Sequence, residues 1–367
     1  MKNFFETLPT RSPFQPGVMA ALGSALLFGA GTPLAKLLLH SVSPWLLAGL
    51  LYIGSGLGLA LYRRVRLLPT PRLNAAEKCW MLAAVVCGGA LAPVLLMWGL
   101  SSLPASHVAL LLNAEAVLTT VFAWALFKEN LGTRIVLGMA TIVLGAVVLA
   151  WPSDGWAAVT TASRDSLWPA AAVLAACGFW ALDNNFTRKV ALADASWVAC
   201  VKGSVAGTTN LLLAFSLGAG VPAWPLAAAS MAVGLLAYGV SLTLFVVGLR
   251  HLGASRAGAY FSVAPFVGAV MAVLLLDESL SWPLAIAAGL MAFGVWLHLT
   301  EQHGHLHAHT AMEHEHDHTH DAHHQHTHDE AAGEFNVQRH SHRHRHTPQQ
   351  HSHAHFPDAH HQHRHSD

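Results

Sequence analysis

Long apolar runs, separated by short polar connectors, fill the first 300 residues of the chain. Crossing the hydrocarbon core of a bilayer takes roughly 20 apolar residues in a helix. Lipid offers the backbone no hydrogen-bond partner, so each run is expected to be helical throughout. The pattern predicts an all-α integral membrane protein with ten transmembrane helices, at about 17–39, 44–62, 77–99, 104–127, 131–151, 167–187, 195–218, 225–249, 253–276 and 280–300.

The composition agrees with this pattern and sets the last part of the chain apart. Hydrophobic residues make up 53% of the chain and charged residues 11%, whereas soluble domains carry about 25% charged residues. Residues 301–367 hold 23 of the 27 histidines and almost no large apolar side chains. With so little apolar surface to bury, this His-rich C-terminal tail is predicted to be disordered.

Loop charges predict the orientation. With the N-terminus inside, the inward segments hold thirteen lysine and arginine residues, and the outward loops hold only Arg164. Basic residues are enriched in cytoplasmic loops, and an even number of spans returns the C-terminus to the same side. We therefore expect a multi-pass protein of the cell membrane (plasma or inner), with both termini cytoplasmic.

The two halves of the membrane region are weakly duplicated. A shift of 149 positions (278 minus 129) places Glu129 on Glu278, and it places Gly99, Leu100, Leu103, Ala105 and Ser106 on Gly248, Leu249, Leu252, Ala254 and Ser255. Each unit has five helices, so the second inserts upside down relative to the first. Inverted repeats with a binding site at the midplane are a recurring transporter design.

Several short segments carry a family resemblance over roughly 17–300. They are FKENL (127–131), LDESL (276–280), SVAPF around Pro265, and the Ala35-Lys36 pair. With the duplicated layout, they make the chain resemble the drug/metabolite transporter superfamily, with two EamA-type domains. The resemblance implies ten helices and movement of small metabolites, amino acids or drugs, commonly as export. One departure is Glu115-Ala116, where the second half has Ala264-Pro265.

These observations predict the domain organisation. A cytoplasmic N-terminal segment (1–16) precedes a first EamA-like five-helix repeat, and an extracytoplasmic loop leads to the second repeat and the tail. The remaining boundaries are 17–151, 152–166, 167–300 and 301–367. Gly56 and the Gly203-x-x-x-Gly207 pair are expected to let helices approach closely.

Polar side chains inside the predicted spans are the candidates for a substrate or proton pathway, because placing them in lipid is costly. They are Glu115, Asn113, Asp183, Asn184, Lys202 and Lys36. Glu115 lies near the middle of 104–127, where low dielectric disfavours its charged form and suits proton exchange. The alternative is a neutral or paired carboxyl group that serves packing alone.

The other candidates also have structural alternatives. Asp183 and Asn184 stand near a helix end, where such side chains commonly bond free backbone groups. Lys36 and Lys202 lie a few residues from span ends, so their amines can snorkel to the interface instead of binding an anionic substrate group. Pro265 is expected to break its span and free carbonyls for a ligand.

The tail predicts non-specific metal binding. Neutral imidazole is a good ligand for Zn, Ni, Co or Cu(II), and alternating histidines in a flexible chain can share one divalent ion. A compositional expansion without a role and a pH-responsive tail are the alternatives. The candidate ligands are His305, His307, His314, His316, His318, His320, His342, His344 and His346.

Three hypotheses of function follow. The first is a proton-coupled or facilitative carrier that exports a small polar metabolite or amino acid by alternating access. The second is an efflux or tolerance protein for divalent Ni, Co or Zn, and the third is a membrane-anchored metal buffer. No nucleotide loop, nucleophile motif or HExxH is present, so an enzyme is not expected and no cofactor is required. The basic loops suit anionic lipids rather than nucleic acid, and a homodimer is left open.

Overall fold

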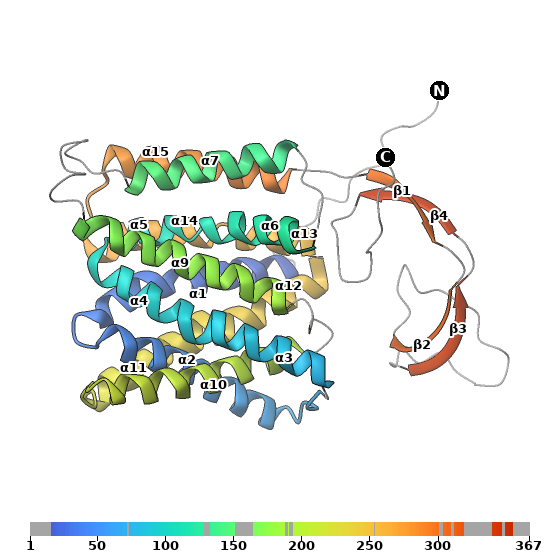
Figure 1. The fold of residues 1–367 in the computed structure, drawn as a ribbon, viewed down its shortest axis with the longest axis horizontal. Coiled ribbons are helices and arrows are strands. Elements are labelled where there is room, and N and C mark those ends of the chain that lie inside the picture. Colours follow the sequence, from blue (N-terminus) through green and yellow to red (C-terminus); the bar gives the residue numbers. More distant parts are fainter. Residues whose placement is uncertain are drawn as a thin grey trace. The chain divides into compact units, whose positions relative to one another are not determined.

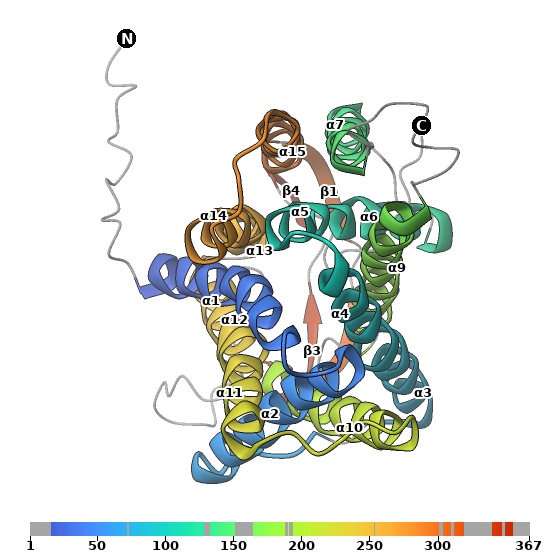
Figure 2. The ribbon, with the colours of Figure 1, turned by 90° about the vertical axis from the view of Figure 1, so that its left-hand side faces the viewer.

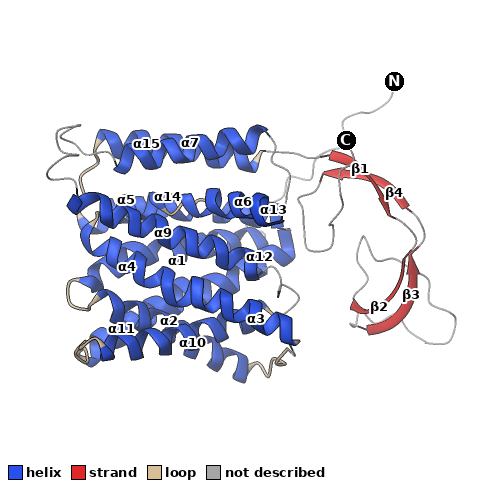
Figure 3. Ribbon diagram, in the orientation of Figure 1, coloured by secondary structure: helices blue, strands red, loops and turns tan. Residues whose placement is uncertain are grey.

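A computed structural model describes residues 16–71, 73–127, 133–150, 164–187, 190, 194–252, 254–300, 304–309, 312–318, 340–346 and 349–354. The chain divides into two compact units, Met1–Glu301 and Gln302–Asp367. Every regular element described in the first unit is helical, whereas those of the second unit are strands (Figure 3).

Over its described residues, the first half of the helical unit contains seven α-helices and one π-helix (Figure 1). Pro44 begins α2 at a position where its missing N–H is not needed. Asn74 and Glu77 form a capping box that begins α3. The elements are α1 (Pro16–Leu39), α2 (Pro44–Val65), α3 (Ala75–Ala84), π-helix η1 (Val85–Leu91), α4 (Ala92–Ser102), α5 (Ala105–Leu111), α6 (Ala114–Phe127) and α7 (Thr133–Ala150).

The second half follows the same order. Its interruptions match those of the first: a π-helix lies inside the third long segment, and a short break divides the fourth. The elements are α9 (Arg164–Thr187), α10 (Ala195–Ser216), α11 (Trp224–Gly234), π-helix η3 (Leu235–Val240), α12 (Ser241–Leu252), α13 (Ala254–Phe261), α14 (Ala264–Leu276) and α15 (Trp282–Leu299).

Eight helical stretches of the described chain have the length and hydropathy of membrane spans. The chain is therefore a multi-pass membrane protein. The two remaining predicted spans correspond to α9 and to α13 with α14. Asp183 and Asn184 lower the hydropathy of α9, and α14 is a shorter apolar helix of 13 residues.

The helices of the two halves interleave. Helix α1 packs against α12 and α14, and in the matching arrangement α9 packs against α4 and α6. Helices α2 and α10 cross closely, because a Cβ atom on Gly203 would lie 2.7 Å from the Gly56 nitrogen. The close contact predicted for these glycines is confirmed. Helices α7 and α15 pack on each other at one edge of the unit (Figure 2).

The described segments of the second unit form two antiparallel ladders. Strand β1 (Gly304–His309) pairs antiparallel with β4 (Gln349–Ala354), and β2 (Met312–His318) pairs antiparallel with β3 (His340–His346). A β-ladder satisfies backbone hydrogen bonds without an apolar core. The alternation of histidine with other residues also has the period of a strand.

Candidate functional site

A buried ion pair joins α9 to α10. The Lys202 ammonium donates a hydrogen bond of 2.5 Å to Asp183 Oδ1 and one of 3.0 Å to Thr187 Oγ1. The Thr187 hydroxyl in turn donates to Asp183 Oδ1 at 3.0 Å. The two charged side chains are 17% and 9% exposed, so each supplies the main compensation for the other's loss of water.

A second polar pair joins α6 to α9. The Asn184 side-chain amide donates to Glu115 Oε1 at 2.8 Å and lies 3.4 Å from the Thr119 hydroxyl. Glu115 stands in the first turn of α6, where the positive end of the helix dipole stabilises a carboxylate. Neighbouring Asn185 donates to the Thr119 and Ala181 carbonyls.

The two pairs belong to one cluster. Glu115 is close enough to Asp183 and Lys202 for their charges to interact. Four of the residues predicted from the sequence therefore come together between α6, α9 and α10. Glu115 comes from the first half of the chain and the other three from the second, so the cluster lies between the two repeated units.

Asp183 also lies against the π-helix η1. A Cβ atom on Gly88 would overlap the Asp183 carboxylate. The Gly88 carbonyl accepts hydrogen bonds from Tyr52 Oη at 2.9 Å and from Trp180 Nε1 at 3.0 Å. π-Helical turns occur often at functional sites. Sequence reasoning missed this wall of the cluster, although the Gly88-Gly89 pair in an apolar run was a signal of close approach.

Asn113 and Pro265 lie at the two helix breaks. Residues 112–113 separate α5 from α6, and residues 262–263 separate α13 from α14, in which Pro265 is the second residue. The Asn113 amide is buried and donates to the Leu110 carbonyl at 2.9 Å, with Met291 Sδ of α15 at 3.8 Å. Its recorded contacts are therefore with α5 and α15, and not with the Glu115 cluster.

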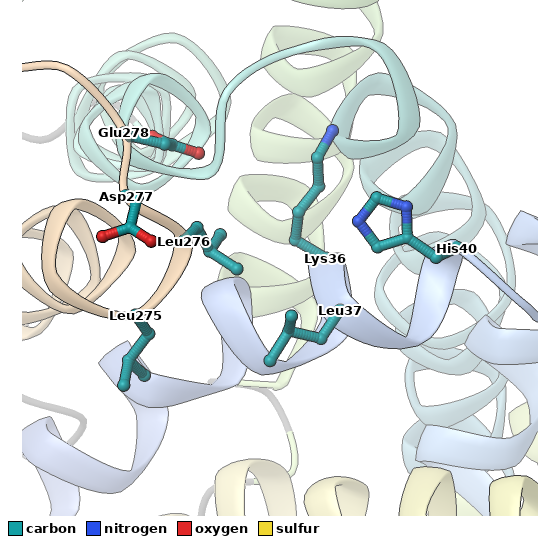
Figure 4. Close-up of a pocket in the computed structure, with 7 residues that line it drawn as sticks. All are labelled: Lys36, Leu37, His40, Leu275, Leu276, Asp277 and Glu278. Carbon is teal, nitrogen blue, oxygen red and sulfur yellow. The ribbon is translucent and has the colours of Figure 1, made fainter.

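The Lys36 side chain lies away from this cluster: it extends from α1 to the C-terminal end of α4. Its ammonium donates to the carbonyls of Leu100 at 2.6 Å, Ser101 at 3.2 Å and Leu103 at 2.8 Å. These are carbonyls that a helix end leaves without intrahelical partners. A hollow of about 330 Å³ adjoins it (Figure 4) and is lined by Lys36, Leu37, His40, Leu275, Leu276, Asp277 and Glu278.

The strand register gives positions for the tail histidines. In one ladder His314, His316 and His318 stand opposite His344, His342 and His340. In the other, His305 stands opposite His353 and His307 opposite His351. His346 stands opposite Met312, and His320 falls outside the described residues. Over the described chain, no three His, Cys, Asp or Glu side chains gather as a metal site.

Comparison with known proteins identifies relatives over the helical unit. The model of the EamA-like transporter family matches residues 15–151 and again 167–300. An uncharacterized transporter of Methanothermobacter thermautotrophicus is 27% identical over 297 residues, covering 77% of this chain and 85% of that protein. A solved crystal structure of 20% sequence identity has a TM-score of 0.57, covering 76% of this chain and 95% of its own.

Proposed function

Since the chain belongs to the EamA-like transporter family, we propose that this membrane transporter exports a small polar metabolite or amino acid by alternating access. The observation that carries the proposal is the polar cluster between the repeats. Glu115 and Asn184 bind each other across α6 and α9, and Asp183 and Lys202 across α9 and α10. Intramembrane charges are costly, and they commonly mark substrate or ion pathways.

The matched packing of the two halves supports two inverted five-helix repeats. In this arrangement α9 and the broken α13–α14 segment also cross the membrane, which gives ten spans and puts both termini on the same side. The excess of basic residues in the loops on that side makes it the cytoplasmic one. Helices α1 and α9 occupy equivalent places, each packed on the third and fourth segments of the other half. Discontinuous helices near the midplane are typical of transporter binding sites.

The chemistry of the cluster suits a zwitterionic or hydrogen-bonding solute. An ammonium group on the substrate can replace Asn184 as the donor to Glu115, and a carboxylate can compete with Asp183 for Lys202. Protonation of Glu115 would remove the charge that holds an ammonium group. Proton exchange at this one carboxyl group can therefore couple solute release to the proton gradient.

Transport by proteoliposomes tests this proposal. We expect Glu115→Gln to abolish proton-coupled movement of the amino acids or metabolites that the wild type carries, while the variant still inserts. Glu77→Gln is the matched control, because a glutamine keeps an oxygen for the capping box of α3. Normal uptake and efflux by the Glu115 variant would refute the role of this residue.

A second proposal concerns the tail, which we propose binds divalent metal ions. The ladder β2–β3 supports it, since three histidines of one strand stand opposite three of the other. Residues directly opposite in an antiparallel pair lie about 5 Å apart at Cβ, and alternate residues share a face of the sheet. Zn, Ni, Co and Cu(II) are the ions that such imidazole groups would take.

Two measurements separate metal binding from metal transport. Calorimetric titration of the full chain with Zn²⁺ should lose most of its binding when His314, His316, His342 and His344 are changed to Gln. The metal sensitivity of a strain that carries the chain without residues 303–367 then shows whether metal binding by the tail has a biological role. Unchanged Zn²⁺ titration would refute the tail site, and altered metal efflux by the tail-less chain would favour the metal-export hypothesis.

A further inference from the structure

Glu278 caps a helix of the opposite repeat. Both oxygens of its carboxylate accept backbone hydrogen bonds at the start of α5, from Ala105 N at 2.6 Å and from Ser106 N at 2.9 Å. The first N–H groups of a helix have no intrahelical partner, and bonds to a charged acceptor are stronger than neutral ones. The contact joins residues 173 and 172 positions apart in the chain.

The turn between α4 and α5 is thus held from two directions. Lys36 of α1 binds the carbonyls that end α4, and Glu278, just after α14, binds the amides that begin α5. Asp277 turns the chain there with a positive φ of 51°. Figure 4 shows Lys36 and Glu278 at the same hollow, from α1 and from the segment after α14. Of these contacts, the one from Glu278 joins the two halves of the chain at the end of the bundle near Lys36.

The internal duplication provides a counterpart at the other end of the bundle. The 149-residue shift that places Glu129 on Glu278 also places Ala105 and Ser106 on Ala254 and Ser255. Ala254 begins α13, and α5 and α13 begin at opposite ends of the helical unit (Figure 1). Glu129 itself lies outside the described residues.

From this arrangement we propose that Glu278 is a positioning residue that latches the Lys36 end shut by capping α5 of the opposite half. The inference rests on the alternating access proposed above, in which one end opens while the other closes. The latch consists of one carboxylate and two backbone amides, so it can break and form without rearranging a helix. The Glu278 latch then shifts the balance between the two states toward the one in which the Lys36 end is closed.

Cysteine accessibility tests the latch without a known substrate. In chains whose four native cysteines are replaced, a single Ser106→Cys or Ser255→Cys reports on each end by its rate of maleimide labelling. We expect Glu278→Ala to raise labelling at position 106 about tenfold and to lower it at position 255. Glu278→Gln keeps one acceptor oxygen, so its labelling rates should lie between those of the wild type and Glu278→Ala.

Matched controls and outcomes decide the proposal. Asp277→Asn removes the neighbouring carboxylate and tolerates the positive φ, so labelling should stay at the wild-type rate. Equal rises at both ends would indicate a merely structural cap, and unchanged rates with Glu278→Ala would overturn the latch directly. Opposite shifts in a chain that moves none of the tested amino acids would support the latch and refute the proposed substrate class.

Discussion

The Asp183 carboxylate occupies the space that a side chain on Gly88 would fill. The contact puts a charged residue of α9 against the π-helical turn of η1, whose Gly88 carbonyl is bound by Tyr52 and Trp180. The Asp183–Lys202 ion pair therefore packs against the backbone of η1 with no space for an additional atom at Gly88. This relationship makes glycine necessary at position 88 for steric reasons.

We predict that Gly88→Ala destabilises the protein and impairs transport. The added methyl group must displace Asp183 or the π-helix, and overpacking of this kind costs about 1–3 kcal/mol. Thermal unfolding in detergent measures the change. Gly289→Ala is the control, because no atom lies within 4 Å of the added Cβ atom on α15 and alanine favours a helix. An equal loss in both variants would contradict the steric argument.

Removal of one charge from the Asp183–Lys202 pair should be more harmful than removal of both. Lys202→Met leaves the Asp183 carboxylate buried without its cation, which costs about 3–5 kcal/mol. Adding Asp183→Asn to that variant should restore most of the stability but not transport. A double-mutant cycle from unfolding curves measures the coupling. Additive losses would show that the two side chains act independently.

Lys36 is predicted to serve stability rather than substrate recognition. Lys36→Ala frees three carbonyls at the end of α4, of which those of Leu100 and Leu103 are part-buried and that of Ser101 is exposed. A buried polar group left unpaired costs about 1–3 kcal/mol. Lys36→Arg should retain most of the stability, and exposed Lys78→Ala on α3 should change little. The melting temperature and the KM for transport separate the two roles. A raised KM at unchanged stability would restore Lys36 to the substrate pathway.

The Arg63–Asp194 pair predicts a pH dependence of stability. Burial raises the pKa of Asp194, but hydrogen bonds from Ser196 and Trp197 and the charge of Arg63 outweigh it and hold the pKa below its usual value. Since the folded pKa is the lower one, the stabilisation is present above the unfolded pKa of about 3.9. It is lost as pH falls further, through the folded pKa.

Asp194→Asn should therefore show a shallower loss of stability below about pH 4 than the wild type. Thermal unfolding between about pH 3 and pH 6 measures the two slopes. Parallel curves for the two proteins would show that Asp194 contributes nothing to the acid response.

Much of the membrane unit could be predicted from hydrophobic pattern alone. The ends of α1 and α2 match the runs 17–39 and 44–62 within a few residues, because the length of a span is imposed by the bilayer. Glu115 and Asp183 could be named as candidates for the same reason, since charge inside such a run is conspicuous.

What the sequence could not reveal were the partners. Lys36 binds backbone carbonyls more than sixty positions away. Every residue has a backbone carbonyl, so the sequence does not identify which ones will accept a hydrogen bond. The π-helices could not be predicted either, because Val85–Leu91 has the composition of an ordinary apolar α-helix. The repeat did single out Glu278, but its capping of α5 depends on the folded arrangement of the two halves.

The crossing of α2 and α10 at Gly56 and Gly203 limits how the halves can move. Their backbones touch with no side chain between them, so they cannot slide along each other without collisions on either side of the glycines. They can still roll about the point of contact. We expect this crossing to act as a fulcrum: displacements should be smallest beside these two glycines and should grow toward both ends of the bundle.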